Sequence, residues 1–247
     1  MLRETGMKQH FGVNLAELLA HKIAAVYPRF NRDGFIQEIQ QSVFQLELVA
    51  RTALIASVLR KYLPDDYRKA LKILLRILGP ENEKETGMFT TGYWLWPVAK
   101  FVELYGTDHF DESMHAIYEI TKRHTGEYAI RPFIRNCPSE SLRLLRRWAR
   151  DRNVHVRRLA SEGLRPRLPW AQKMTLFTDN PTQVFAVLEI LKDDRSKFVQ
   201  KSVANNIRDY LKDNPKAALS LLKTWKDNPT PQRLWIIKHA SRKLADL

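Results

Sequence analysis

Apolar residues recur every three or four positions along most of this 247-residue chain, the spacing of one face of an α-helix. This pattern predicts helices over 15–26, 35–44, 48–59 and 71–78, and more helices after residue 95. No stretch alternates apolar and polar residues over enough positions to predict a sheet. The polar stretch 81–92, which contains two glycines, predicts a loop.

The second half of the chain repeats its own layout. Segments 148–168 and 191–211 each carry the end of a helix, an Asp-bearing turn and the start of a second helix, and Val156 and Val199 are 43 residues apart. A third copy begins at Trp225. Helix pairs with a period of about 35–45 residues are typical of HEAT and armadillo arrays.

We therefore predict an all-α fold, a right-handed α-solenoid of HEAT-like helical repeats, in which the second helix of each pair lines a concave face. We expect one domain over residues 1–247, with an N-terminal helical cap at roughly 1–80 and repeats at roughly 95–247. The aspartates in the turns are expected to cap the second helices or to stiffen the turns. They are Asp151, Asp193, Asp194 and Asp227.

Positive charge is concentrated in one part of the chain. The whole chain has 41 Lys and Arg against 27 Asp and Glu, whereas residues 122–173 alone hold fourteen basic residues, twelve of them Arg, against four acidic ones. The planar guanidinium can contact two phosphate oxygens at once. The concave face is thus predicted to be basic and to bind nucleic acid, with an anionic membrane or an acidic protein as the other possible partners.

Several other chemistries have no counterpart in the sequence. Cys137 is the single cysteine, and His109, His155 and His239 do not have metal-ligand spacing. There is no signal-peptide core, no apolar run of about twenty residues, no phosphate-binding glycine loop and no nucleophile elbow. We expect no metal, no cofactor and no membrane partner, and a monomer that acts in the cytoplasm.

Three segments carry a resemblance to a known family: EYAIRPF at 127–133, NVHVRRLASEGLRPRLPW at 153–170 and KSVANNIRDYLKDNP at 201–215. They closely resemble the AlkC branch of the AlkC/AlkD superfamily of HEAT-like repeat DNA glycosylases. HFGVNLAELLAHKIAAVYPRF, near the N-terminus, looks like the family's opening helix, so the resemblance covers nearly the whole chain.

The resemblance implies a monofunctional DNA glycosylase in base excision repair. Such an enzyme hydrolyses the N-glycosidic bond of cationic alkylated bases in double-stranded DNA, for example 3-methyladenine, 3-methylcytosine or 7-methylguanine. It also implies catalytic acids in the concave cleft at Glu127, Glu162 and Asp209.

The spacing of these acids agrees with the repeat. Glu127 and Glu162 are 35 residues apart, and the 43-residue register aligns Glu162 with Asn205, one helical turn before Asp209. Three carboxylates are therefore expected to converge. Taken singly, each acid is explained as well by an ordinary ion pair, such as Glu162 with Arg158 or Arg165.

Hydrolysis of the N-glycosidic bond would explain why carboxylates lie in a basic groove. A cationic alkylated base is already a good leaving group, so no strong general acid is needed. Its departure builds positive charge on the deoxyribose, which nearby anions stabilise while they orient or deprotonate water. A shallow groove with acids on its floor suits an approach to the sugar of a bent duplex better than base flipping.

We also assign aromatic and phosphate contacts to residues expected near these acids. We place Trp170, preceded by Pro169, beside the lesion, although a core tryptophan is the other interpretation. Trp94 and Trp96 either cover the edge of the DNA or pack in the core. The expected phosphate contacts are Arg131, Arg157, Arg158, Arg165, Arg167 and Lys201.

The main alternative is a noncatalytic HEAT-repeat module that binds DNA, RNA or an acidic protein; a peptide-binding transport scaffold is a more distant one. Two departures from the family pattern bear on the comparison. Many AlkC-type proteins carry a C-terminal immunoglobulin-like domain, and we predict none in this chain. In addition, the charged Arg208 and the aromatic Tyr210 flank Asp209, which bears on lesion preference.

Overall fold

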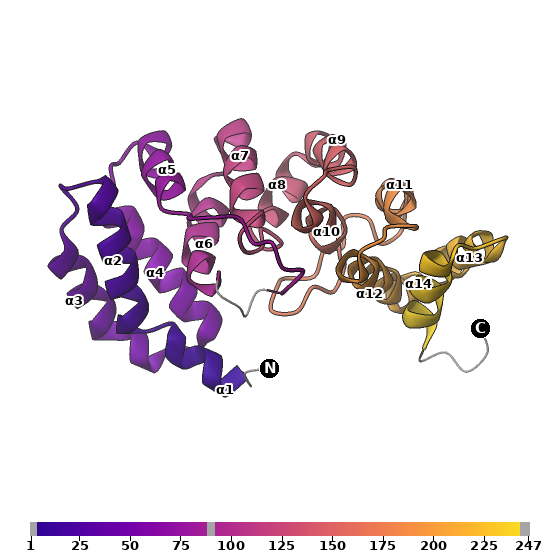
Figure 1. Cartoon of the computed structure of the whole chain (residues 1–247), viewed down its shortest axis with the longest axis horizontal. Helices are drawn as coiled ribbons and strands as arrows, with labels where there is room; N and C mark the ends of the chain where they lie inside the picture. Colours follow the sequence, from indigo (N-terminus) through magenta and orange to yellow (C-terminus); the bar gives the residue numbers. More distant parts are fainter. Residues whose placement is uncertain (1–3, 88–91, 243–247) are drawn as a thin grey trace. The chain divides into compact units, whose positions relative to one another are not determined.

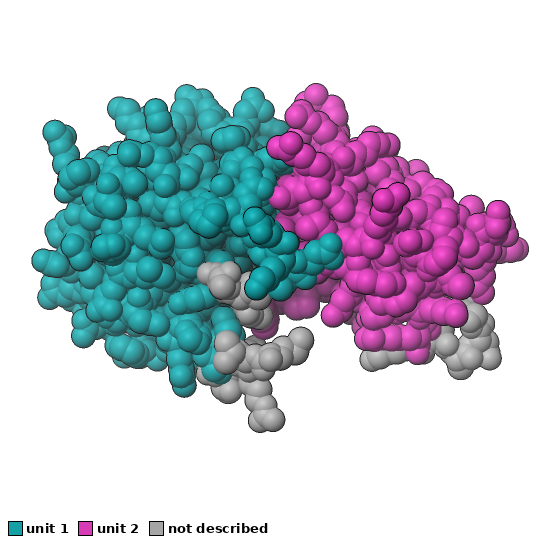
Figure 2. Space-filling view, viewed as in Figure 1, with its two compact units in different colours: residues 1–130 teal, residues 131–247 magenta. Residues whose placement is uncertain are grey.

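The structure is a computed structural model that describes residues 4–87 and 92–242. All regular elements in these described ranges are helices, and no strand occurs in them (Figure 1). The chain divides into two compact units, residues 1–130 and residues 131–247 (Figure 2).

Unit 1 is built from paired antiparallel helices. Its 3-10 elements are η1 (Lys8–His10), η2 (Val43–Gln45) and η3 (Tyr93–Leu95). Its α-helices are α1 (Glu4–Met7), α2 (Val13–Val26), α3 (Arg32–Ser42), α4 (Leu48–Tyr62), α5 (Tyr67–Arg76), α6 (Trp96–Tyr105) and α7 (Phe110–Thr121). Helix α2 packs on α3 and α5, α4 packs on α3 and α6, and α7 packs on α5 and α6. Most residues of the apolar stripes that predicted these helices form the core of the unit. Phe44, at the end of the predicted helix 35–44, is an exception: it lies in η2 and is 64% exposed.

The predicted loop at 81–92 is partly described. Residues 81–87 form no helix, and they are tied to the end of α7: Glu81 pairs with Lys122 at 2.8 Å, and the Asn82 amide donates to the Lys122 carbonyl. Positions 88–91 of the predicted loop lie outside the described residues.

Unit 2 consists of a short helix and three helix pairs. The helices are α8 (Arg131–Asn136), α9 (Pro138–Trp148), α10 (Val154–Glu162), α11 (Thr182–Leu191), α12 (Lys197–Asp213), α13 (Pro215–Lys226) and α14 (Pro231–Ser241). The pairs are α9 with α10, α11 with α12, and α13 with α14. The second helices α10, α12 and α14 pack side by side, while α9 and α11 lie above α10 and α12 in Figure 1.

The 43-residue register is visible in the core of unit 2, where Val156 on α10 and Val199 on α12 are both completely buried. The predicted all-α fold of HEAT-like helical repeats is confirmed. Since a repeat of this type buries its apolar face only against its neighbours, the equivalent valines occupy equivalent places between successive helices.

The turns that start α10 and α12 are built alike. Asp151 accepts a hydrogen bond from the Asn153 amide at 2.8 Å, and Asn153 then caps α10 by accepting from its first amides. Asp194 accepts in the same way from Ser196, which caps α12. Asp151 and Asp194 thus stiffen their turns, and the residues two positions later are the caps. Before α14 the cap is Thr230.

Candidate active site

Glu162 is the last residue of α10 and faces α12. Its side chain is buried, with 5% of the residue exposed, and both of its oxygens are engaged. Arg165 donates to Oε1 at 2.7 Å, and the Ser202 hydroxyl on α12 donates to Oε2 at 2.6 Å. Arg158, one turn earlier on α10, lies 3.5 Å from Oε1. The carboxylate is therefore held between two successive repeats.

Asp209 projects from α12 toward the same arginine. Arg165 donates through Nε to Asp209 Oδ2 at 2.9 Å and through its terminal nitrogen to Oδ1 at 3.4 Å. The backbone amide of Arg167 lies 3.3 Å from Oδ2. Since Arg165 also binds Glu162, one buried guanidinium bridges the two carboxylates that the sequence placed in the site.

The two carboxyl groups differ in acidity although they share Arg165. Burial disfavours the charged form of Glu162, but the positive charges of Arg158 and Arg165 outweigh it and keep the pKa of Glu162 below its ordinary value. At Asp209 burial is the stronger influence, and it raises the pKa above the ordinary aspartate value against the hydrogen bonds from Arg165. The site thus contains a firmly ionised carboxylate beside one that takes up a proton more readily.

Glu127 lies in unit 1, in the turn that follows α7. It is buried, and its Oε2 accepts from the Thr125 hydroxyl at 2.9 Å. Glu162 and Asp209 belong to unit 2. The structure brings those two together, and the convergence of all three acids stays a prediction.

A long irregular segment, residues 163–181, separates α10 from α11. Arg131 on α8 is buried, with 2% exposed, and donates to three backbone carbonyls of this segment: Gly163, Arg165 and Gln172. An arginine that fills three carbonyl acceptors fixes the path of a chain that lacks its own ladder of hydrogen bonds. Here Arg131, predicted as a phosphate contact, holds the backbone next to Asp209 in place.

Trp170 sits in this segment with a strained backbone. Its φ is +59°, in the left-handed region that residues with a side chain rarely occupy, and 43% of the residue is exposed. Such a conformation costs on the order of 1–3 kcal/mol. Strain together with a large exposed aromatic ring is typical of a ligand-contacting position, which is the role that the sequence suggested for Trp170.

Most of the other predicted phosphate contacts are arginines already engaged by carboxylates. Arg157 donates to Asp194 of the next repeat at 2.6 Å and to the carbonyls of Asp151 and Arg152. Arg158 lies over the Phe198 ring, 4.7 Å from its centroid. Arg167, with a side chain 45% exposed, pairs with Asp213, while Lys201 is exposed on α12. Of the six, Arg167 and Lys201 are the two exposed ones.

Ser202, Asn206 and Asp213 contact Glu162, the Ser161 carbonyl and Arg167, respectively, and were not among the site residues predicted from the sequence. With Asp209 they form a polar stripe along one face of α12, at positions 202, 206, 209 and 213. Asn206 donates to the Ser161 carbonyl at 2.7 Å, which fixes the end of α10. A polar stripe with helical spacing inside an otherwise apolar helix was the signal that could have identified them.

Trp94 and Trp96, for which the sequence allowed either a DNA contact or core packing, have different surroundings. Trp96 is buried, stacks on Tyr128 at 5.5 Å and meets Phe11 edge-on, so it packs in the core of unit 1. Trp94 lies under the Lys22 ammonium, 4.6 Å from the ring centroid, and lines a cavity of about 780 Å³.

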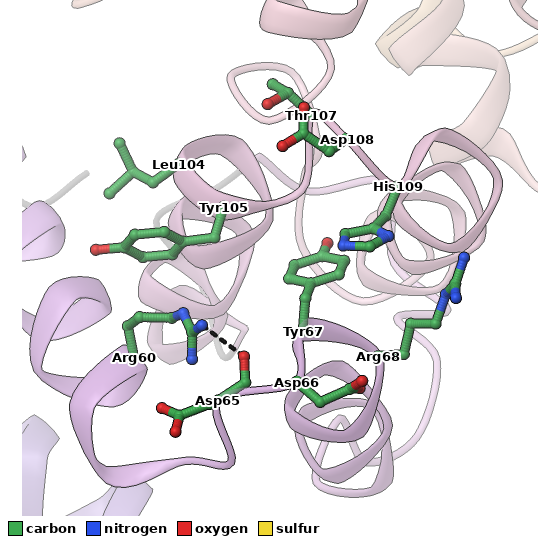
Figure 3. Close-up of a pocket in the computed structure, with 10 residues that line it drawn as sticks. All are labelled: Arg60, Asp65, Asp66, Tyr67, Arg68, Leu104, Tyr105, Thr107, Asp108 and His109. Atoms are coloured by element: carbon green, nitrogen blue, oxygen red, sulfur yellow. Dashed lines mark hydrogen bonds between the residues drawn. The ribbon is translucent and has the colours of Figure 1, made fainter.

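A separate pocket in unit 1 contains none of the predicted site residues. It has a volume of about 460 Å³ and lies between the turn after α4 and the turn after α6 (Figure 3). Tyr105, Arg60 and the Tyr67–His109 stack line it. Within the described ranges no group of His, Cys, Asp and Glu could hold a metal ion, and no helix there is long and apolar enough to cross a membrane.

Comparison with known proteins adds three findings. Residues 123–244 match the model of a family described as DNA alkylation repair enzyme. An uncharacterized protein of Bacillus subtilis (strain 168), YhaZ, is 35% identical over 239 residues, 96% of this chain and 64% of YhaZ. The Pseudomonas fluorescens alkylpurine DNA glycosylase AlkC, solved bound to DNA containing an abasic site analog, superposes with a TM-score of 0.86 at 34% identity. That match covers 96% of this chain and 64% of AlkC, so the chain spans just under two thirds of either protein.

Proposed function

We propose that the chain is a DNA glycosylase that removes cationic alkylated bases. The premise is that residues 123–244 belong to the DNA alkylation repair enzyme family. Its substrate is double-stranded DNA that carries 3-methyladenine or 3-methylcytosine. The observation that carries this proposal is the buried pair Glu162 and Asp209 bridged by Arg165. Trp170, strained and exposed, lies in the same segment, 163–181, as Arg165, and adds support to the proposal.

The reaction breaks the bond between the sugar C1′ and the base nitrogen. The base already carries a positive charge, and it leaves as a neutral molecule with the bonding electron pair. Positive charge then develops on the deoxyribose, and water adds to C1′ and loses a proton. Because water is the nucleophile, no lysine adduct forms and the enzyme is monofunctional.

The two carboxyl groups take different parts in this step. Glu162, held ionised by Arg158 and Arg165, supplies negative charge that stabilises the oxocarbenium-like sugar. Asp209, whose pKa is raised by burial, is the better proton acceptor and positions the attacking water. Glu127 is proposed as the third acid and Trp170 as the aromatic contact to the lesion.

Phosphate contacts around the lesion are assigned to Arg167 and Lys201, which are exposed in unit 2. The four other predicted basic residues are assigned a supporting role. Arg131 holds segment 163–181, Arg158 and Arg165 hold the acids, and Arg157 ties together the turns before α10 and α12. The proposed enzyme acts as a cytoplasmic monomer on DNA, without metal or cofactor, and reaches the deoxyribose without a closed pocket for a flipped base.

The test incubates the purified protein with N-methylated DNA and separates released bases by chromatography. Wild type is expected to release 3-methyladenine well above the uncatalysed rate. Glu162→Gln and Asp209→Asn keep shape and remove charge, and each is expected to lose at least about a hundredfold in rate while still binding DNA. The matched control is Glu140→Gln, an exposed carboxylate on α9, which should excise normally.

No release by wild type would refute the glycosylase and leave a noncatalytic DNA-binding module. Unchanged excision by both amide variants would mean that the two acids are purely structural. Separate substrates that carry 3-methyladenine, 3-methylcytosine or 7-methylguanine would then rank the lesions.

A further inference from the structure

A row of arginines covers one side of α9, outside the candidate active site. The opposite side of this helix is apolar and buried through Leu142, Leu145 and Trp148. The row, which we call the α9 arginine stripe, consists of Arg143, Arg146, Arg147 and Arg150. Offsets of three, four and seven residues align side chains along one helical face, so the four guanidinium groups are neighbours.

The stripe is not neutralised. Arg143, Arg147 and Arg150 are exposed, and Arg146 is half-buried next to the Gln183 side-chain oxygen. Within the part of the chain that the structure describes, no carboxylate lies within ion-pair distance of any of the four. This contrasts with Arg157, Arg165 and Arg167, each of which is held by a carboxylate.

Helix stability accounts for only part of the stripe. The helix dipole favours cations in the last turn, which explains Arg146 and Arg147. Arg150, beyond the helix end, donates to the Arg146 carbonyl at 3.0 Å and so also caps the helix. Arg143 lies a turn earlier, where the dipole gives no such gain, and like charges at these spacings repel one another. An uncompensated row of this kind is expected where an anionic partner supplies the missing charge.

The stripe is also distinct from the catalytic cluster. Glu162 and Asp209 lie on the second helices α10 and α12, whereas the stripe is on a first helix and points away from the side of α9 that is packed. Lys201 and Arg167, the exposed bases near the acids, belong to α12 and to segment 163–181. The two basic surfaces are therefore separate in unit 2.

We propose that the α9 arginine stripe is a second contact surface for the phosphate backbone of DNA, independent of the lesion. Seven residues of helix span about 10 Å, close to the rise of three base-pair steps, which separate the first and the last of four successive phosphates on one strand. Guanidinium groups, rather than ammonium groups, make up the whole stripe, and these match phosphate oxygens in pairs. The choice of DNA over an acidic protein rests on the proposed function. Contacts of this kind hold the protein on undamaged DNA between lesions.

The test compares two variants that lose the same charge. The stripe variant combines Arg143→Gln, Arg147→Gln and Arg150→Gln. The control variant combines Lys216→Gln, Lys223→Gln and Lys226→Gln, three exposed lysines of α13. Affinity for an undamaged 30-base-pair duplex is measured by fluorescence anisotropy between 50 and 200 mM salt.

The stripe variant is expected to bind about tenfold more weakly than the control, and its log–log salt slope should be shallower by roughly two. An equal loss in both variants would overturn the proposal, because net charge alone would then explain it. A third variant with lysine at the same three positions should recover most of the affinity and slope. If it binds as weakly as the glutamine variant, the arginines act through the fold and not through phosphate contact.

Two further measurements separate this proposal from the glycosylase. Binding to undamaged duplex requires no excision, so the comparison remains valid if no base is released. If the protein does excise bases, the stripe variant should keep the wild-type single-turnover rate on saturating lesion DNA. Polyglutamate is then tested as a competitor of the labelled duplex. If it competes as strongly as unlabelled DNA, and does so only when the stripe is intact, the partner is an acidic protein and the proposal is refuted.

Discussion

Removing Arg165 is expected to destabilise unit 2 strongly. Its guanidinium is almost fully buried and donates to Glu162 and Asp209 together. In Arg165→Met both carboxylates stay buried. Asp209 loses its bidentate partner, and Glu162 keeps the Ser202 hydroxyl and the Arg158 guanidinium at 3.5 Å. Breaking a buried ion pair by removing one partner costs about 3–5 kcal/mol, because the other charge is left uncompensated.

The size of this loss should depend on pH. Without Arg165 the pKa of Asp209, already raised by burial, moves further up, and the folded variant can escape the cost by binding protons. With an unfolded value near 3.9, protonating an aspartate at pH 5 costs only about 1.5 kcal/mol, against roughly 5.6 kcal/mol at pH 8. A group whose pKa is raised in the folded state gives stability below its unfolded pKa and loses it as pH rises through the folded value. The variant is thus expected to lose about 3–5 kcal/mol at pH 8 and roughly 2 kcal/mol at pH 5.

Urea denaturation followed by circular dichroism at the two pH values measures this difference. The matched control is Arg167→Met. The Arg167 side chain is 45% exposed, and its buried partner Asp213 keeps Lys173 at 3.0 Å, so the loss should be only about 1 kcal/mol at both pH values. Adding Asp209→Asn to the Arg165 variant should recover part of the lost stability at pH 8. A loss below about 1 kcal/mol in Arg165→Met, equal at both pH values, would refute the reasoning.

Three further predictions follow from the same geometry. Ser196→Ala removes the cap of α12 and should destabilise by about 1 kcal/mol in thermal melts, whereas Ser139→Ala at an exposed position should not; equal effects would contradict the capping role. Because φ at residue 170 is +59°, Trp170→Gly should be about 1 kcal/mol more stable than Trp170→Ala, while both lose excision; an alanine variant as stable as the glycine one would argue against strain. The excision rate should fall in acid as Asp209 takes up a proton, and the fall should be centred above the ordinary aspartate pKa because burial raises the pKa of Asp209. Single-turnover rates from pH 4 to 8 measure this fall. A fall centred at or below the ordinary aspartate pKa would contradict the prediction.

The fold could be predicted from local patterns in the sequence. Three- and four-residue spacing predicted the helices, and the 43-residue register placed Val156 and Val199 in equivalent buried positions. The resemblance to the AlkC branch, which rested on three segments, is confirmed by the family match over residues 123–244 and by the likeness to AlkC at a TM-score of 0.86. These signals are local or periodic, so a single sequence contains them.

The roles of the arginines could not be predicted in the same way. Charge counting treats Arg131 and Arg167 alike, yet one is buried on carbonyls 32 to 41 residues away and the other is exposed. The bridge from Arg165 to Asp209 spans 44 residues and depends on how α10 packs on α12. Pairing over such separations is a property of packing, and so is the left-handed backbone at Trp170, a residue type that gives no hint of it.

The bond from Arg157 to Asp194 has a consequence for building hybrids of this protein and its relatives. Each partner sits in a different repeat: Arg157 on α10, and Asp194 in the turn before α12. At the position 43 residues after Arg157, Gln200 donates to the Asp194 carbonyl as Arg157 donates to that of Asp151. If a whole helix pair is exchanged with that of a relative, Arg157 or Asp194 therefore meets a residue from the other parent in place of its own ion-pair partner. A crossover placed after Asp194, within the turn itself, inherits both members of the pair from the same parent.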